Sequence, residues 1–416
     1  MKLLEVDVVT ARRYILGLQG LWPGRRWNGI QGLHSAVQEI GSVQVDPLDV
    51  VGQSQDLALC ARVETYRPSL LDHALYERRS LFEWGANLHI RPIEELPYML
   101  SKMRKWDYQN RRASFERTHQ GLIAEVLRDV ETRGPLGSRD LVGGERISSY
   151  RARRDTGLAL FYLWLRGDLM IHSRLRGERR YDLTSKLVQP RLLVPASPED
   201  SEEHFLRRGM RLLGLPNASE MLMVQRLSSE SSVRASQRNS WVHNQERLGR
   251  LVRVEVKGWR GPHWADAGDA PLLERLARGD VPKRWRPLST TTEDEATFLA
   301  PLEIVSARGR SKKIFDFEYV WEVYKPASKR RWGYYTLPIL HGETLKARAE
   351  LRFDREENAL RVLDFWLEAW TKPSDQGFAR AVARGLDRLR TMTGAGRVDL
   401  KGVRPSGFRS LVARGT

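Results

Sequence analysis

Two segments of the sequence repeat one order of local structure: a helix, a glycine turn and two short strands. The first, ALFYLWLRGDLMIHSRLRGERRYDL, covers residues 159–183, and the second, SWVHNQERLGRLVRVEVKGWRGPHWADA, covers residues 240–267. In both, a Gly-x-Leu step ends the helix, and a basic residue followed by glycine forms the turn between the strands. These positions are Gly167–Leu169 and Arg176–Gly177 in the first segment, and Gly249–Leu251 and Lys257–Gly258 in the second.

This order constrains the fold, because helices followed by a two-stranded hairpin with a basic tip form the winged-helix plan. The alternative is that the two segments are unrelated hairpins. The tip of a winged-helix hairpin can lie on a phosphate backbone, where basic side chains contact phosphate oxygens. Arg176 and Lys257 are therefore predicted to be nucleic-acid contacts.

The rest of the chain divides into a helical first part and a strand-rich last part. The predicted helices cover 9–21, 30–41, 66–84 and 94–134, with Gly41 as a C-cap and Ser69 as an N-cap. After the linker-like segment 281–296, the runs TFLAPLEIV, KIFDFEYVWEVY, RRWGYYTLPIL, TLKARAELRF and ALRVLDFWLEAW predict strands of a small barrel or curled sheet. Residues 374–394 predict a final amphipathic helix.

Charge narrows the choice of partner. The sequence has 69 Lys and Arg against 52 Asp and Glu, a formal net charge of +17. Such an excess favours a polyanion as the binding partner, because each phosphate contact releases counterions, although an Arg-rich proteome would produce the same excess.

The single cysteine, Cys60, excludes an internal disulfide and a cysteine zinc cluster. No run approaches the ~20 apolar residues of a membrane span and the N-terminus does not resemble a signal peptide, so we expect a cytosolic protein.

The stretch GSVQVDPLDVV, residues 41–51, carries the main candidate for chemistry. Val43 and Val45 alternate with Gln44 and Asp46, which predicts a short strand with the amide and the carboxylate on one face. A carboxylate can activate water or stabilise developing positive charge, and a neighbouring amide can fix that water. The alternative is that the two residues form an ordinary turn and cap. Asp49 is a competing carboxylate.

A second candidate is KPASKRRWGYYTLPIL, residues 325–340, which we expect to form a hairpin with a basic tip. Cations interleaved with aromatic rings suit phosphate contact and base stacking, whereas the alternative is a solvated hairpin above core aromatics. The candidate contacts are Lys329, Arg330, Arg331, Trp332 and Tyr334.

Other polar residues carry weaker signals. His89 and His341 are more often structural than catalytic when they occur singly, and the basic stretch 102–112 is more often a solvated helix face than a DNA contact. The sequence contains no Walker P-loop, GxGxxG after a strand, HExxH or GxSxG motif, and its histidines lack metal-ligand spacing. No cofactor or metal is therefore expected.

Four of the stretches together resemble one family, the YcaQ/AlkZ-like winged-helix DNA glycosylases. They are SVQVDPLDVV, ALYERRSLFEW, LFYLWLRGDLMIHSRLRGERRYDL and, the most specific, FDFEYVWEVYKPASKRRWGYYTLPILHGETLKARAEL. The resemblance implies an α+β protein with three tandem winged-helix units, followed by a β-barrel-like domain and a terminal helix. The expected boundaries are 1–114 for the unit with the catalytic pair, 115–196 and 197–290 for the next two units, and 291–416 for the barrel-like domain with the basic hairpin.

The resemblance also assigns roles to residues. Members carry a Gln, an apolar residue and then Gln or Asp, which here is Gln44–Val45–Asp46. Asp46 would activate water or stabilise the cationic sugar, and Gln44 would position the water. The substrate would be double-stranded DNA with N7-alkylated purines, including interstrand crosslinks, and the protein a monofunctional, monomeric enzyme of DNA repair or genotoxin resistance, associated with the nucleoid during repair.

The chain departs from the family pattern in two places. LAPLEIVSARGR, residues 299–310, lacks the Asp and Trp of many relatives. GANLHIRP, residues 85–92, lacks the His expected from many relatives, although it contains His89. The rival functions are a non-catalytic winged-helix regulator and an RNA-associated protein. A regulator has no need of a carboxylate facing DNA, and no RNA-binding signature occurs.

Overall fold

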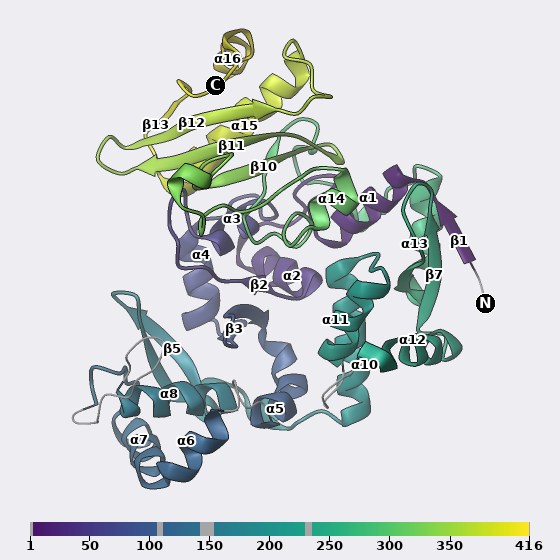
Figure 1. Cartoon of the computed structure of the whole chain (residues 1–416). Helices are drawn as coiled ribbons and strands as arrows, with labels where there is room; N and C mark the ends of the chain where they lie inside the picture. Colours follow the sequence, from purple (N-terminus) through teal and green to yellow (C-terminus); the bar gives the residue numbers. More distant parts are fainter. Residues whose placement is uncertain (1–2, 106–110, 142–153, 229–234, 416) are drawn as a thin grey trace. The chain divides into compact units, whose positions relative to one another are not determined.

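The computed structural model describes residues 3–105, 111–141, 154–228 and 235–415. Its contacts divide the chain into two compact units, one of residues 1–70 with 205–416 (the large unit) and one of residues 71–204 (the small unit) (Figure 1). Both contain helices and strands, so the predicted α+β class is confirmed. The four-domain division stays a prediction, because these contacts divide the chain more coarsely.

The small unit holds the first repeated segment. Helix α8 (Asp155–Arg166) ends at Gly167, which has a φ of +90°, and the hairpin of β5 (Leu169–Leu175) and β6 (Glu178–Leu183) follows. Its turn places Arg176 and Gly177 at positive φ. The predicted order of helix, glycine turn and hairpin is therefore correct. The unit also contains α5 (Leu96–Lys105), α6 (Arg112–Thr118), α7 (Gln120–Arg133) and α9 (Thr184–Leu187).

The predicted helix over 66–84 is wrong in its second half. Helix α4 (Pro68–Asp72) continues into a π-helical turn that ends at Glu77, and Ser69 lies inside α4 instead of capping it. Arg79 has a φ of +55°, which ends the helical path. All four residues of β3 (Leu81–Trp84) are buried, and the strand pairs with β4 (His89–Pro92), so pairing and burial override the helical periodicity.

The large unit holds the second repeated segment. Helix α12 (Arg238–Arg247) is followed by the hairpin of β7 (Leu251–Val256) and β8 (His263–Asp266), again in the predicted order. The N-terminal strand β1 (Leu3–Val6) pairs in parallel with β7, which the sequence did not predict. Buried residues of α10 (Pro198–Leu213), α11 (Ala218–Ser228) and α12 pack on the hairpin; these are Leu206, Met210, Leu213, Met221, Val224 and Val242.

The first seventy residues of the large unit agree with the predicted helices. Helix α1 (Val8–Leu18) begins after Asp7, whose side chain accepts the Thr10 N–H, and α2 (Gly29–Ile40) ends at Gly41, with a φ of +93°. Strand β2 (Val43–Gln44) and α3 (Ser54–Cys60) follow. Helix α13 (Ala270–Ala277) packs against α1.

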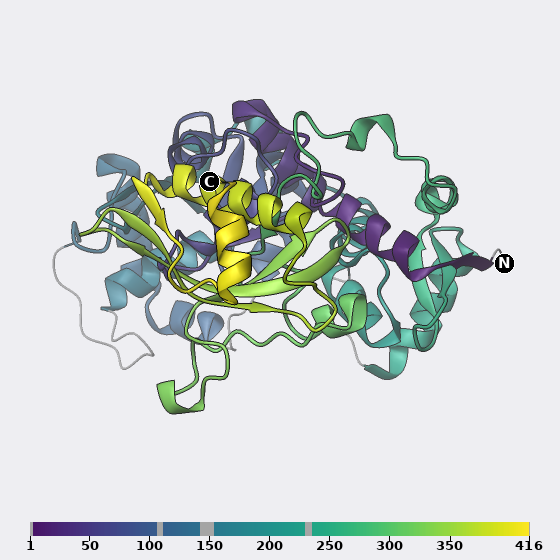
Figure 2. The same ribbon diagram turned by 90° about the horizontal axis from the view of Figure 1, so that it is seen from above.

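The C-terminal part of the large unit is an open sheet in the order β13-β12-β11-β10-β9. The sequence predicted either a small barrel or a curled sheet here, and the observed strand order is that of a sheet. The strands are β9 (Thr297–Phe298), β10 (Thr336–His341), β11 (Thr344–Asp354), β12 (Ala359–Leu367) and β13 (Arg397–Asp399). Figure 2 shows α15 (Gln376–Thr393) across one face, which confirms the helix predicted over 374–394. It is not the final helix, because α16 (Ser406–Ala413) follows and packs on α15.

One predicted strand is much shorter than expected, and another does not form. Only Thr297–Phe298 of the run 297–305 is a strand, and the run 313–324 begins inside helix α14 (Arg310–Phe315) and then continues without a strand partner. Phe317 and Tyr319 are buried while Glu318 and Val320 are exposed, so the alternation seen in the sequence is real. Arg348 binds the Glu318 carbonyl, which satisfies a backbone group without a ladder.

Candidate active site

Gln44 is the last residue of β2, and Asp46 lies at the start of the segment that joins β2 to α3. The strand contains only Val43 and Gln44, so the prediction of one strand carrying both polar residues is wrong in its length. Asp46 follows in irregular backbone, and both side chains are half-buried. The pair is thus placed where the chain leaves a strand, between a buried valine and an exposed proline, Pro47.

Hydrogen bonds fix Asp46 on both its main chain and its side chain. Its N–H donates to Gln55 Oε1 at 3.2 Å, and its Oδ1 accepts the Leu48 N–H at 2.9 Å. Gln55 is buried and also donates to Gln53 Oε1. Among the described residues, no lysine, arginine or histidine lies within ion-pair distance of Asp46. Its carboxylate is therefore oriented but not neutralised by a cation.

Asp49, the competing carboxylate, has a different environment. Its Oδ2 accepts from Arg355 Nη2 at 2.6 Å, and both side chains are exposed. A carboxylate oxygen that already accepts from a guanidinium is less available to bind and orient a water. The geometry therefore favours Asp46 over Asp49 as the reactive carboxylate.

The C-terminal sheet holds the segment between β2 and α3. Phe353 N, in β11, donates to Val50 O at 2.8 Å, and Tyr335 Oη donates to Gly52 O at 3.5 Å. Burial raises the pKa of Tyr335, and nearby Tyr319 and Asp46 raise it further, so the phenol stays protonated. The catalytic candidates and the C-terminal sheet thus belong to one packed structure, although they are far apart in the sequence.

Gln44 has a partner that the sequence did not predict. Its Oε1 accepts from Arg308 Nη2 at 3.2 Å. Gln55 and Arg308 both act on the candidate pair, yet neither carried a sequence signal. Gln55 stands in an ordinary helix start, and Arg308 is 264 positions from Gln44.

The basic segment does not form the predicted hairpin tip. Residues 316–335 run as irregular backbone with one 3-10 turn at Ala327–Lys329, and they project from the sheet (Figure 2). Glu322 is buried and organises the segment, because it accepts the N–H groups of Arg331 and Trp332 at 2.8 and 2.7 Å and binds Lys325. Burial alone would raise the pKa of Glu322, but these donors outweigh it and the pKa is lowered.

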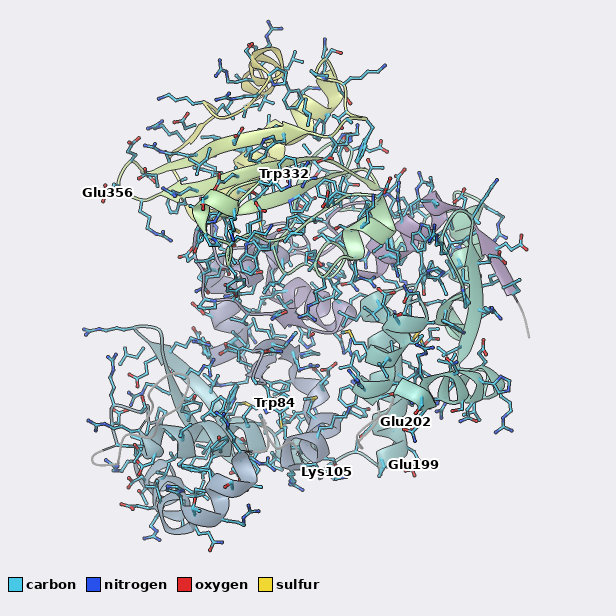
Figure 3. All side chains as sticks on the ribbon, viewed as in Figure 1. Trp84, Lys105, Glu199, Glu202, Trp332 and Glu356 are labelled. Atoms are coloured by element: carbon cyan, nitrogen blue, oxygen red, sulfur yellow. The ribbon has the colours of Figure 1, made fainter. Side chains whose placement is uncertain are left out.

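Two of the predicted stacking rings are already covered. Figure 3 labels Trp332, in the C-terminal part of the large unit. The guanidinium groups of Arg331 and Arg348 lie 4.5 and 4.2 Å from its ring, and Trp366 packs edge-on against it. Arg330 lies 4.7 Å from the Tyr334 ring. Tyr324, which the sequence pattern did not single out, has a free ring in this segment: it is 85% exposed and makes a T-shaped contact with Trp321.

The predicted wing tips and the remaining candidates lie elsewhere. Arg176, in the small unit, and Lys257, in the large unit, are exposed at their hairpin turns. His341 binds the Glu293 carbonyl, and burial lowers its pKa. Part of the basic stretch 102–112 lies outside the described residues. Among the residues described, no group of three His, Cys, Asp or Glu side chains could hold a metal, and no helix is long and apolar enough to cross a membrane.

Comparison with known proteins identifies the class. The family model for AlkZ-like DNA glycosylases matches residues 37–392, a range that includes Gln44, Asp46 and the basic segment. The chain belongs to this family and is a DNA glycosylase, an enzyme of DNA repair, which favours catalysis over the regulator alternative. A solved structure with the same fold is Streptomyces sahachiroi DNA glycosylase AlkZ. It aligns with a TM-score of 0.62 and 15% identity over 96% of this chain and 100% of that chain.

Proposed function

We propose that this glycosylase is monofunctional and hydrolyses the N-glycosidic bond of N7-alkylated purines in duplex DNA, with Asp46 and Gln44 as its catalytic pair. The observation that carries the proposal is the state of Asp46. Its carboxylate is half-buried, oriented by the Leu48 N–H, and without a cation partner among the described residues. Asp49 lacks this combination because Arg355 pairs with it.

The chemistry is hydrolysis at C1′ of the damaged nucleotide. The C1′–N9 bond breaks and its electron pair moves to the base, which leaves a sugar with oxocarbenium character. Water bonds to C1′ while one of its protons passes to Asp46, which later releases that proton to solvent. Gln44 holds the water beside the carboxylate. The Asp46 charge also stabilises the cationic sugar after the C1′–N9 bond has begun to break and before water bonds to C1′.

We choose the substrate class because the proposed pair supplies one carboxylate, Asp46, as the base and no second carboxyl group to act as a general acid. A purine alkylated at N7 already carries positive charge, so the departing electron pair neutralises it and no general acid has to protonate the base. Glycosidases that act on neutral leaving groups use a second carboxyl group as that acid. A crosslink that joins two N7 atoms has the same charged leaving group, so we include crosslinks in the proposed substrates.

We assign DNA binding to basic side chains at the surface, of which Arg330 is half-buried and the others are exposed. Lys329, Arg330 and Arg331 would contact phosphates. The rings of Tyr334 and Trp332 pack against the guanidinium groups of Arg330 and Arg331 and would hold them in position. Arg176 and Lys257 would contact phosphate at the tips of two winged-helix units. A third winged-helix unit in residues 1–114 completes the proposed four-segment organisation.

Tyr324 is the group we propose to stack on a base. Its ring is exposed beside Lys325, and Trp321 connects it to Tyr335, with ring centroids 5.9 and 6.3 Å apart along this series. Tyr335 in turn lies near Asp46, whose charge raises the pKa of its phenol. An exposed ring among cations is the usual platform for an unstacked base.

The test of this function is the release of bases from four duplexes, carrying N7-methylguanine, a nitrogen-mustard crosslink between guanines, hypoxanthine or uracil. We expect release of N7-methylguanine and unhooking of the crosslink, and no release of the two neutral bases. The abasic strand should remain intact until alkali is added. Release of only the neutral bases, or trapping of a covalent enzyme–DNA adduct with borohydride, would contradict the proposal.

A further inference from the structure

Arg308 occupies an unusual backbone position beside the catalytic pair. It is exposed, its φ is +55°, and its Nη2 donates to Gln44 Oε1 at 3.2 Å. Residues with a side chain rarely adopt positive φ, and such conformations persist only where the surrounding structure holds them. The contact to Gln44 therefore depends on what fixes the backbone on either side of Arg308.

Ion pairs of two buried arginines, Arg62 and Arg310, anchor both sides of this position. Before it, Glu303 accepts two hydrogen bonds from the Arg62 guanidinium, at 2.8 and 2.9 Å, and both side chains are buried. After it, the buried Arg310 donates to the carbonyls of Ile304 and Leu213, at 2.9 and 2.7 Å.

Glu220, on α11, completes the second anchor, because it pairs with both Arg310 and Lys313. Removing one partner of a buried pair is strongly unfavourable, so these anchors hold the turn between them in place. Arg308 is thus the exposed residue of a turn that is fixed at both ends.

We propose that Arg308 is a positioning residue that fixes the direction of the Gln44 amide during base release. The inference rests on the proposed function. An amide has its acceptor at one end and its two donors at the other. Because the guanidinium occupies Oε1, the free end of Gln44 presents only N–H groups.

This orientation sets the geometry of the attacking water. A water that accepts an N–H bond from Gln44 and donates a proton to Asp46 keeps one lone pair free for C1′. If the amide were reversed, its oxygen would compete with Asp46 for the water's protons, and no N–H group would fix the direction of the water's free lone pair toward C1′. The Arg308 charge also polarises the amide and strengthens its N–H donors.

The test is a double-mutant cycle on base release from N7-methylguanine duplex DNA, measured in single turnover with enzyme saturating. Losing one hydrogen bond to a charged donor should slow Arg308→Ala by about tenfold. Arg308→Lys should recover part of the rate, since one N–H suffices. In a Gln44→Ala background, Arg308→Ala should have no further effect. Lys312→Ala, which removes an exposed charge from α14, is the control and should release base at the wild-type rate.

Three results would overturn the inference. Effects of Arg308 and Gln44 that multiply in the double variant would show that they act separately. A wild-type rate for Arg308→Ala with a weaker, less salt-dependent affinity would make Arg308 a phosphate contact only. Failure of this inference is distinct from failure of the proposed function, since Asp46→Asn in the same assay reports on the latter. No release by the wild type would overturn both.

Discussion

Asp46 owes its orientation to two neighbours and not to the strand that precedes it. Leu48 fixes its carboxylate and Gln55 fixes its backbone, so the residue is held although it lies outside β2. The sequence pattern was enough to select Gln44 and Asp46 as candidates, because the alternation with valines is local. Gln55 and Arg308 could not be selected in this way, since their contacts depend on how distant parts of the chain fold.

Gln55→Leu tests the backbone anchor of Asp46. The substitution leaves the Asp46 N–H without its acceptor, and a lost hydrogen bond of this kind corresponds to about 1 kcal/mol, or roughly five- to tenfold in rate. We expect single-turnover base release to fall by that factor while DNA affinity is unchanged. Gln225→Leu is the control for a general loss of stability, because it removes a different buried glutamine, on α11. Equal rates for the two variants would contradict the assigned role.

At the scale of elements, the segment 316–335 shows why sequence alternation misled the prediction. Phe317 and Tyr319 point into the core at every second position, as in a strand. A strand also needs a neighbouring backbone, and here a side chain, Arg348, takes the Glu318 carbonyl instead. The repeats at 159–183 and 240–267 were predictable because their order of helix, glycine and hairpin is set by local residues.

Tyr324→Ala tests the free ring of this segment. The side chain is 85% exposed, so its loss should leave the thermal stability unchanged. Base–aromatic stacking contributes about 1–3 kcal/mol, so DNA affinity should fall by roughly five- to a hundredfold. Tyr334→Ala, which removes a ring that Arg330 already covers, is the comparison variant and should lose less affinity. A larger loss of affinity in Tyr334→Ala would place the stacking contact there.

His263, in β8, makes the β7–β8 region sensitive to acid. The side chain is 1% exposed, and burial, followed by the charge of Lys313, lowers its pKa to about 4, while Glu220 raises it. An unfolded histidine binds a proton near pH 6.5, so between pH 6.5 and 4 the unfolded state holds more protons and stability falls as pH falls.

We therefore expect the free energy of unfolding to drop between pH 7 and 4.5 by about 2 kcal/mol more in the wild type than in His263→Gln. Denaturant titrations at each pH measure this difference. His243→Gln, at a side chain 71% exposed, should follow the wild type. If His263→Gln loses as much stability as the wild type, another group governs the acid response.

For the whole molecule, the sequence sets the net charge of +17, and the fold determines which charged side chains are paired and which are exposed. Many arginines serve internal pairs, among them Arg62 with Glu303 and Arg310 with Glu220. Composition alone could not separate these from the exposed cations that remain for a polyanion. The parallel pairing of β1 with β7 was equally beyond the sequence, because no local signal tells a strand which partner it will meet.

Replacing Lys329, Arg330 and Arg331 together by alanine tests whether these side chains contact DNA phosphates. The affinity should fall, and the slope of log K against log salt should decrease by about one unit for each lost phosphate contact. The control replaces the exposed Lys401, Arg404 and Arg409, with the same change in net charge, and should leave the slope unchanged. Equal decreases in both variants would mean that net charge alone determines binding.

The role of Asp46 is best tested by single-turnover release of N7-methylguanine by Asp46→Asn, with DNA affinity measured in parallel. The substitution keeps the shape of the side chain and removes its charge and its basicity, so release should fall by about 10²- to 10⁴-fold with affinity retained. Asp49→Asn, which changes the paired carboxylate three positions later, should remain close to the wild type. Release by Asp46→Asn at the wild-type rate would contradict the assignment of Asp46 as the catalytic carboxylate.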